Sequence, residues 1–280
     1  MKKLCFFIAF SLLLPLMCGS AAQPEGNGLF CWDSEAVEEA GRQELFDRMD
    51  SAGATVLYQY FSEEGSKSCI RSFLTDAAAR GIQVYYLTGE PEWSLDPEGE
   101  QMLAQVRRAA RINKKLPEQA RLRGVLMDAE PYLTDRWEGN EDETLARFAQ
   151  AMGKVHESAA ERGLVCALCI PFYYDNSVRL ERLAELIRCC DSLAIMNYSK
   201  YDEAEHIAAE IALAGSRPVT VIYELQEPGR YGLQESNTYF YDGLEAVEES
   251  FRKLKTIFDR EDLSFALHDY EALKEMEENE

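Results

Sequence analysis

The sequence has 280 residues, of which 46% are hydrophobic and 28% are charged, with only 17 Gly and 9 Pro. This composition supplies enough apolar side chains for a sizeable core and excludes a disordered or fibrous chain. The formal net charge of −21 argues against nucleic acid and against anionic membrane surfaces as partners.

The first segment has the pattern of a secretory signal peptide. Two lysines precede an almost wholly apolar stretch from Leu4 to Met17, and Ser20-Ala21-Ala22 offers small residues for cleavage. We therefore expect residues 1–22 to be a signal peptide that is cleaved after Ala22, and residues 23–280 to form a secreted or periplasmic domain. A lipid anchor on Cys18 is less favoured because the bulky Met17 precedes it. No later stretch is apolar over the 18 residues that a membrane span needs.

After residue 27 the sequence alternates short apolar runs with amphipathic helical stretches. Eight such β–α units in about 250 residues predict an α/β fold, a single (β/α)8 barrel of the TIM type. An open doubly wound sheet is the alternative, but no glycine-rich phosphate loop follows the first strand. The predicted strands are Gly28–Trp32, Thr55–Phe61, Ile82–Leu87, Leu122–Met127, Leu164–Ile170, Ser192–Asn197, Pro218–Tyr223 and Leu263–Leu267.

Six cysteines follow the predicted cleavage point, an even number that permits disulfides in an exported protein. Cys166 and Cys169 have the spacing of a zinc or redox pair, but both fall in the apolar run Leu164–Ile170. Residues three apart on a strand point to opposite faces, so these two are expected to be buried hydrophobes or disulfide partners. No spacing of His or carboxylate residues predicts a metal site, and we expect no metal and no cofactor.

Catalytic residues of such barrels lie where the strands end and the following loops begin. The fourth of these exits carries Asp128 and Glu130, which are two residues apart and share the interior parity of Leu126. Carboxyl groups this close raise the pKa of one of them, and a raised acid beside a charged one suits general-acid cleavage of a glycosidic bond. The alternative is a structural ion network with Arg123 or Arg136.

Two short motifs resemble the chitinase-type barrel glycosidases, which carry Asp-x-Asp-x-Glu on strand four and Met-x-Tyr-Asp on strand six. Here the corresponding segments are Asp128-Ala129-Glu130 and Met196-Asn197-Tyr198-Ser199. The resemblance implies that Glu130 protonates the leaving oxygen and that Asp128 orients the acetamido group of the substrate. That group would attack the anomeric carbon, and Tyr198 would hydrogen-bond it.

The sequence departs from this family at several positions. Leu126 and Arg123 stand where the family has its two earlier aspartates, and Ser199 replaces the final acid of the strand-six motif. The family's tryptophan on strand eight is missing, with His268 near its place. These departures leave open a barrel that binds carbohydrate without cleaving it, because binding survives losses that abolish turnover.

The seventh strand exit offers a second mechanism of the same reaction class. Glu224 ends the predicted strand, and the arrangement resembles the retaining glycosidases of the large cellulase-like clan, which carry an acid/base Glu on strand four and a nucleophilic Glu on strand seven. In that case Glu130 keeps its role and Glu224 becomes the nucleophile, with carboxyl groups about 5–5.5 Å apart.

Aromatic and polar residues at the other exits complete the predicted site. Flat aromatic rings pack well against the C–H-rich faces of sugars. The residues expected to bind substrate are Trp32, Asp33, Trp93, Tyr132, Asn197, Glu227 and His268.

The sequence thus predicts an exported glycoside hydrolase of a neutral or N-acetylated glycan, with Glu130, Asp128, Glu224 and Tyr198 as catalytic residues. The alternatives are a non-catalytic carbohydrate-binding barrel and a hydrolase of another bond, such as an amide or phosphodiester. The expected partner is an oligosaccharide or polysaccharide. Neither the sugar, the linkage nor the oligomeric state follows from the sequence.

Overall fold

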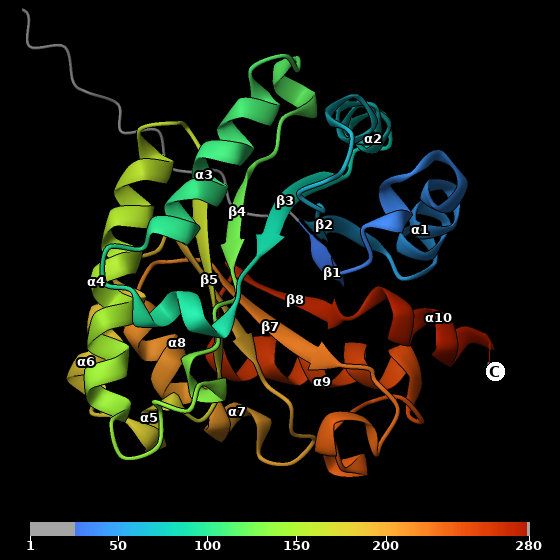
Figure 1. The fold of residues 1–280 in the computed structure, drawn as a ribbon. Coiled ribbons are helices and arrows are strands. Elements are labelled where there is room, and N and C mark those ends of the chain that lie inside the picture. Colours follow the sequence, from blue (N-terminus) through green and yellow to red (C-terminus); the bar gives the residue numbers. More distant parts are fainter. Residues whose placement is uncertain (1–25, 279–280) are drawn as a thin grey trace, which may run out of the picture.

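The protein is a closed barrel of eight parallel strands in the order β1 to β8, as the sequence predicted (Figure 1). The computed structural model describes residues 26–278. The predicted signal peptide and the alternative lipid anchor at Cys18 lie outside the described residues. The strands are β1 (Asn27–Cys31), β2 (Ala54–Tyr60), β3 (Gln83–Thr88), β4 (Gly124–Met127), β5 (Val165–Pro171), β6 (Ser192–Met196), β7 (Val219–Glu224) and β8 (Leu263–His268).

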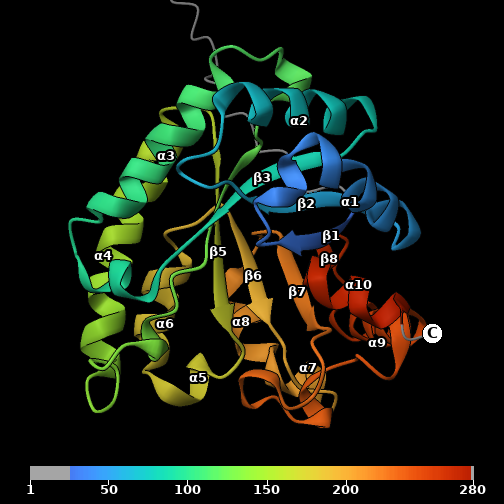
Figure 2. The ribbon, with the colours of Figure 1, turned by 45° about the vertical axis from the view of Figure 1, so that its right-hand side comes forward.

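Helices surround the barrel, and none of those in residues 26–278 is both long and apolar enough to cross a membrane. The α-helices are α1 (Glu39–Ser51), α2 (Lys67–Ala79), α3 (Glu100–Asn113), α4 (Glu141–Ala160), α5 (Tyr174–Ser177), α6 (Leu180–Ile187), α7 (Glu203–His206), α8 (Ala208–Ala214), α9 (Gly243–Phe258) and α10 (Tyr270–Glu278). The 3-10 helices are η1 (Glu35–Val37), η2 (Pro91–Leu95), η3 (Glu118–Ala120), η4 (Pro131–Leu133), η5 (Arg230–Gly232) and η6 (Glu235–Asn237). In Figure 2 the arrowheads of β5, β6 and β7 point towards the side where α5 and α7 lie.

The observed strands begin or end one or two residues away from the predicted limits, and the differences have a physical reason. At the ends of β3, β7 and β8 the prediction followed apolar runs, whereas the backbone ladder continues into a polar residue; β1, β2 and β6 instead end one residue before the predicted limit. Thus β7 includes Glu224 and β8 includes His268, which are register partners on neighbouring strands. Polar side chains can occupy these last strand positions because the barrel opens there.

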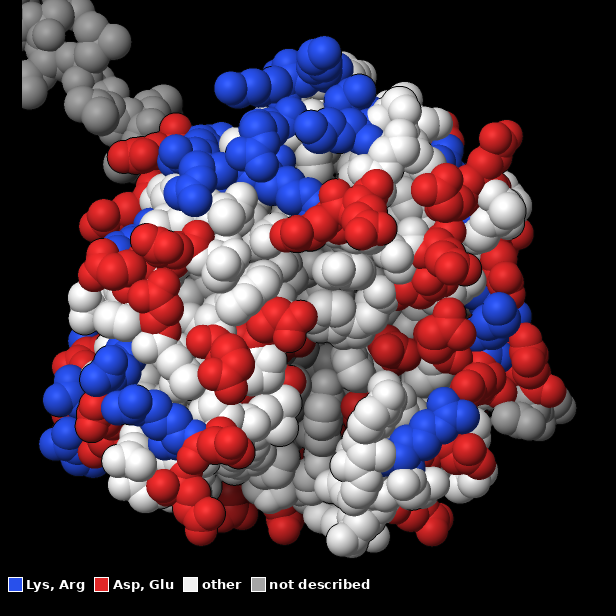
Figure 3. All heavy atoms as spheres, in the orientation of Figure 1, with Lys and Arg blue, Asp and Glu red and all other residues white. Residues whose placement is uncertain are grey.

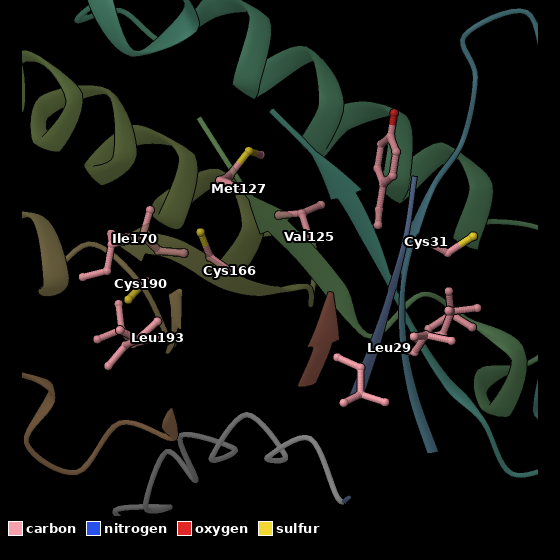
Figure 4. Packing of buried hydrophobic residues seen from close by; sticks show 14 of the residues in the cluster. Leu29, Cys31, Val125, Met127, Cys166, Ile170, Cys190 and Leu193 are labelled. Atoms are coloured by element: carbon pink, nitrogen blue, oxygen red, sulfur yellow. The ribbon is translucent and has the colours of Figure 1, made fainter. Parts of the chain in front are cut away.

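Two separate apolar cores stabilise the fold, one on each side of the strands. The outer core lies between strands and helices, and Figure 4 shows part of it, including Val125, Met127 and Cys166. The inner core fills the barrel and is formed by the alternate positions of the strands, among them Leu126 and Cys169. Cys166 and Cys169 therefore face opposite sides of β5, as predicted. All six cysteines of the described chain are free thiols.

The inner core combines large aromatic side chains with very small residues on the neighbouring strands. Phe30, Tyr58 and Tyr85 pack in a row across β1, β2 and β3, with ring centroids 4.7 and 5.5 Å apart. Gly124 provides the opposite extreme on β4, because a Cβ atom there would lie 2.2 Å from the carbonyl oxygen of Val165. The contact is with backbone of the adjacent strand, which cannot move away without breaking the ladder between β4 and β5.

We expect Gly124→Ala to lower the free energy of unfolding by about 1–3 kcal/mol, because the added methyl group overpacks the junction of β4 and β5. The matched control is Gly153→Ala in α4, where the new Cβ would lie 3.8 Å from Cys189 Sγ, an ordinary contact. Alanine is favoured over glycine inside a helix, so this variant should gain about 0.5–1 kcal/mol. Urea unfolding of both variants measures the difference. Equal midpoints for Gly124→Ala and wild type would contradict the tight approach.

Candidate active site

A layer of polar side chains lies on top of the inner core, at the carboxyl ends of the strands. These residues continue the interior parity of their strands by one step: Asp128 follows Leu126, Tyr198 follows Met196, and Glu224 follows Ile222. His268 follows Ala266 in the same way and is paired in register with Glu224. The closed barrel thus brings together residues that are up to 140 positions apart in the sequence.

Asp128 is the first residue after β4, and the backbone holds it firmly in place. Its N–H donates to the carbonyl oxygen of Thr88 at 2.9 Å. The neighbouring Gly89 leaves room for this approach, since a Cβ atom there would lie 2.0 Å from the Asp128 carbonyl oxygen. Burial raises the pKa of Asp128, whereas a hydrogen bond from the Cys169 thiol and the charge of His268 lower it. Its Oδ1 atom is buried and has no hydrogen-bond partner among the described residues.

Glu130 is the second carboxyl group of the pair, and its electrostatic environment favours the protonated form. Burial and the nearby negative charge of Asp128 raise the pKa of Glu130 to about 7. The Tyr132 hydroxyl donates a short hydrogen bond to Glu130 Oε1 and, like the charge of His268, acts in the opposite direction. Glu130 is therefore a carboxylic acid at mildly acidic pH and loses its proton near neutrality, which is the range that a general acid requires.

Glu224 and His268 form a buried ion pair beside these carboxyl groups. His268 Nδ1 lies 3.1 Å from Glu224 Oε2, and the two side chains are 17% and 3% exposed. The other carboxylate oxygen, Oε1, accepts the N–H of Gln226 at 2.8 Å. Burial lowers the pKa of His268, but the hydrogen bond and the charge of Glu224 outweigh it and raise the pKa to about 9. The imidazole is therefore a cation at neutral pH.

Tyr198 presents a neutral hydroxyl group to the same layer. Its ring centroid lies 5.9 Å from that of His268. Burial and the charge of Glu224 raise the pKa of Tyr198 well above its ordinary value, so the phenol keeps its proton. The hydroxyl makes no hydrogen bond with any residue in the described part of the chain, which leaves it free to donate to a ligand.

Aromatic rings flank the polar layer on two sides. Trp32 lies against Tyr60 with ring centroids 6.0 Å apart, on the side of β1 and β2. Tyr132 lies against Tyr173 with centroids 5.6 Å apart, on the side of β4 and β5. Trp32, Tyr132 and Tyr198 each pack on the inner core and remain partly exposed. Such surfaces suit the apolar faces of sugar rings.

Four residues that the sequence placed in the site have other neighbours. Asn197 is buried on the outer side of β6, where its Nδ2 donates to the carbonyl oxygen of Glu203 at 3.2 Å. Asp33 Oδ1 accepts the N–H of Glu35 at 2.7 Å where η1 begins. Trp93, in η2, packs against the outer core. Glu227 Oε2 lies 3.9 Å from Arg230 Nη2, and Glu227 Oε1 accepts a hydrogen bond from the Tyr241 hydroxyl at 3.4 Å. Their roles in binding stay predictions.

Cys169, which the sequence predicted to be a buried hydrophobe or a disulfide partner, lies beside the polar layer. Its thiol is next to Asp128, and burial together with the charges of Asp128 and Glu130 raises the pKa of Cys169 well above its ordinary value. The parity of β5 could have revealed it, because Cys169 shares the interior side with Ala167. Residues 26–278 contain no group of three or more His, Cys, Asp or Glu side chains arranged to hold a metal ion.

Comparisons with known proteins support the fold of this chain. No protein-family model and no curated protein matches the sequence. Among solved structures, the Group IV chitinase of Ostrinia furnacalis has a TM-score of 0.57 at 10% identity, covering 88% of this chain and 92% of that chain. The GH18 chitinase ChiB of Flavobacterium johnsoniae has a TM-score of 0.55 at 11% identity, with coverages of 90% and 89%.

A sugar epimerase has the same fold to a similar degree. The D-psicose 3-epimerase of Clostridium cellulolyticum H10 has a TM-score of 0.55 at 14% identity, covering 86% of this chain and 84% of that chain. At these identities the likeness establishes the barrel fold alone, because one such fold carries many chemistries. The resemblance to chitinase-type barrels that two motifs suggested therefore extends to the architecture.

The buried ion pair gives a direct spectroscopic prediction. The chain has three histidines, so the imidazole signals are few enough to follow individually by NMR. We expect the His268 signal to titrate with a pKa of about 9. In Glu224→Gln this pKa should fall, because burial lowers the pKa of His268 and the charge of Glu224 that raises it is then absent.

His268→Asn assigns the signal, and His156 and His206 serve as internal controls in the same spectra. An unchanged His268 titration in Glu224→Gln would show that the ion pair does not set the charge of the imidazole.

Proposed function

We propose that the protein is a glycoside hydrolase that acts on a neutral or N-acetylated glycan, with Glu130 as the general acid. The observation that carries this proposal is the state of Glu130, a carboxyl group with a pKa of about 7 next to a second carboxyl group at the mouth of the barrel. Cleavage of a glycosidic bond needs an acid that still holds its proton near neutral pH and can give it to the leaving oxygen.

Asp128 and Tyr198 fit the remaining parts of a substrate-assisted reaction. The buried Oδ1 of Asp128 has no partner among the described residues, so an N–H donor of an acetamido group would satisfy it. The free hydroxyl of Tyr198 would donate to the carbonyl oxygen of the same group, which then attacks the anomeric carbon. The adjacent His268 cation favours the ionised form of Asp128 and so helps to keep the two carboxyl groups in different protonation states.

The alternative role of Glu224 as an enzyme nucleophile has less support. Its side chain is 3% exposed, and both carboxylate oxygens are engaged, one with His268 and the other with the N–H of Gln226. A nucleophile needs a free oxygen directed at the substrate. We therefore assign Glu224 the role of a positioning residue that fixes the charge and orientation of His268.

The comparisons support a carbohydrate as the ligand. The solved structures named above are called chitinases and a D-psicose 3-epimerase, the latter with D-tagatose, so sugars are common to them. Export of this chain, expected from the sequence of residues 1–22, would place such an enzyme together with an extracellular or periplasmic oligosaccharide or polysaccharide.

A barrel that binds a glycan without cleaving it is the second candidate. It is favoured by Ser199, which replaces an acid of the chitinase-type motif and donates its hydroxyl to the carbonyl oxygen of Tyr201 at 3.2 Å. A hydrolase of another bond is the third candidate, and loss of activity on treatment with a chelator would favour it.

The decisive measurement is sugar release from β-glucan, chitin-type and peptidoglycan-type oligosaccharides. We expect Glu130→Gln to lower kcat by roughly 10²–10⁴-fold, the usual contribution of general acid catalysis, while the affinity for the sugar stays within a few-fold. The matched control is Glu138→Gln, which removes an exposed carboxylate from the loop after the same strand and should leave the rate unchanged.

Equal rates of Glu130→Gln and wild type would refute the assignment of the acid. Binding of one glycan by both proteins, with cleavage by neither, would favour the carbohydrate-binding barrel. Under the proposed mechanism Glu224→Gln retains part of the activity and lowers the pKa of His268, whereas a nucleophile at Glu224 would make its loss as damaging as that of Glu130.

The pH dependence of kcat/KM tests the coupling between the two carboxyl groups. The rate should fall above pH 7 as Glu130 loses its proton. The negative charge of Asp128 raises the pKa of Glu130, so Asp128→Asn should move this basic limb to lower pH in the residual activity. If the basic limb of the pH profile lies at the same pH in Asp128→Asn and wild type, the charge of Asp128 does not set the pKa of the group that causes this limb.

A further inference from the structure

A dense cluster of cationic side chains interrupts the acidic surface of this protein. Residues 107–123 contain seven Lys and Arg residues and a single acid, although the whole chain has a net charge of −21. In Figure 3 the corresponding patch is the continuous blue area at the top, over the end of α3 and the start of β4 in Figure 1. We define the basic face as Arg107, Arg111, Lys114, Lys115, Arg121 and Arg123.

These cations lack the carboxylate partners that are common elsewhere in the described chain. Arg42 pairs with Asp76, and Lys200 lies 2.6 Å from Asp242, but no residue of the basic face forms an ion pair with a described acid. Five of the six are exposed, and Arg123 is half-buried. Acidic residues outnumber basic ones by 50 to 29, so an unpaired cluster of this size leaves a strong local positive potential. Arg108 is excluded because it points inward to the Tyr86 hydroxyl.

The basic face is also hollowed. A cavity of about 880 Å³ lies between the ends of α3 and α4 and the starts of β4 and β5, lined by Lys114, Arg121, Arg123 and Arg162. Two acids line it as well, Glu118 and Asp191. Asp191 is already engaged, because its oxygens contact His156 Nε2 at 2.9 Å and the N–H of Cys166 at 2.8 Å. Cationic groups therefore dominate what an incoming ligand would meet.

The place of this face in the barrel indicates what it could contact. It lies at the amino ends of the parallel strands, opposite to the end that carries Asp128 and Glu130. A membrane contacted at this end would leave the mouth of the barrel open to solvent.

We propose that the basic face docks on an anionic phospholipid surface and orients the barrel with its mouth away from the bilayer. Several exposed cations on one face attract the phosphate groups of anionic lipids together, as polybasic clusters of four to eight residues do. The net charge of −21 argued against anionic membranes as partners. At 0.1 M salt, however, the electrostatic field of each charged group is screened over about 10 Å. A surface that touches this face therefore experiences the local cations and little of the distant acids. This inference does not depend on the proposed activity.

The test is sedimentation of the full-length chain with vesicles of phosphatidylcholine alone and of phosphatidylcholine with phosphatidylglycerol. We expect binding to the anionic vesicles to be at least tenfold tighter and to weaken as salt is raised from 0.05 to about 0.5 M. The variant Arg107→Gln/Arg111→Gln/Lys114→Gln/Lys115→Gln should lose this preference.

The control is Lys67→Gln/Arg71→Gln/Arg252→Gln/Lys255→Gln, which removes the same charge from positions that also lack ion pairs among the described residues but lie on α2 and α9. It should bind like wild type. Any contribution of residues 1–25, including that of Lys2 and Lys3 to anionic vesicles, is common to all three proteins, so the difference between the two variants reports the basic face. Equal loss in both variants, or no preference for anionic vesicles, overturns the proposal. Binding of inorganic polyphosphate or of RNA without binding of vesicles overturns it in favour of a soluble polyanion.

Discussion

Alternation of side chains along parallel strands is the constraint on which the rest of this structure depends. In a closed barrel every second residue must face the interior, and the interior below the mouth has to be filled by apolar groups such as Phe30, Tyr58 and Leu126. On each strand, the next residue of the same parity lies beyond these apolar groups and faces the mouth of the barrel. Asp128, Tyr198, Glu224 and His268 all occupy it, so one register, set by the backbone ladder, assembles groups from strands that are distant in sequence.

The electrostatics of the mouth follow from this crowding. Three acids and one imidazole lie close together and largely buried at the mouth, so they cannot all be charged independently. The negative charge of Glu224 is balanced by the His268 cation in their ion pair. The same cation lowers the pKa of Asp128 and of Glu130. Burial and the charge of Asp128 together leave Glu130 as the group with a proton near neutral pH. The pKa of Glu130 therefore depends on Asp128 and His268, and the pKa of His268 depends on Glu224 and Asp128.

The sequence predicted those parts of the fold that depend on local patterns. Strands buried on both faces read as continuous apolar runs, so all eight could be found, and strand parity predicted the side of Asp128, which follows Leu126 of the inner core. The same parity argument also applies to Asn197, which lies between Met196 and Tyr198 and must therefore face outward, and to Cys169, which must face inward. These two positions could have been predicted but were not.

Other features depend on contacts that no local pattern encodes. The hydrogen bond between Glu224 and His268 joins residues 44 positions apart and requires the register of β7 and β8. Glu227 contacts Arg230 and Tyr241, and Trp93 in η2 packs against the outer core. The run of seven cations within residues 107–123 is visible in the sequence, but its exposure on one face without carboxylate partners among the described residues follows only from the structure.

The raised pKa values of Asp128 and Glu130 have a thermodynamic consequence for the whole barrel. A carboxyl group whose pKa is higher in the folded state than in the unfolded chain binds its proton more tightly when folded, so its ionisation lowers the stability of the fold as the pH rises from the unfolded value to the folded one. At the mouth, ionisation of these two carboxyl groups therefore lowers the free energy of unfolding near neutral pH. Replacing Asp128 or Glu130 by a neutral isostere would therefore make the barrel harder to unfold at neutral pH, whereas replacing Glu224 would leave the buried His268 cation without its partner and weaken the fold.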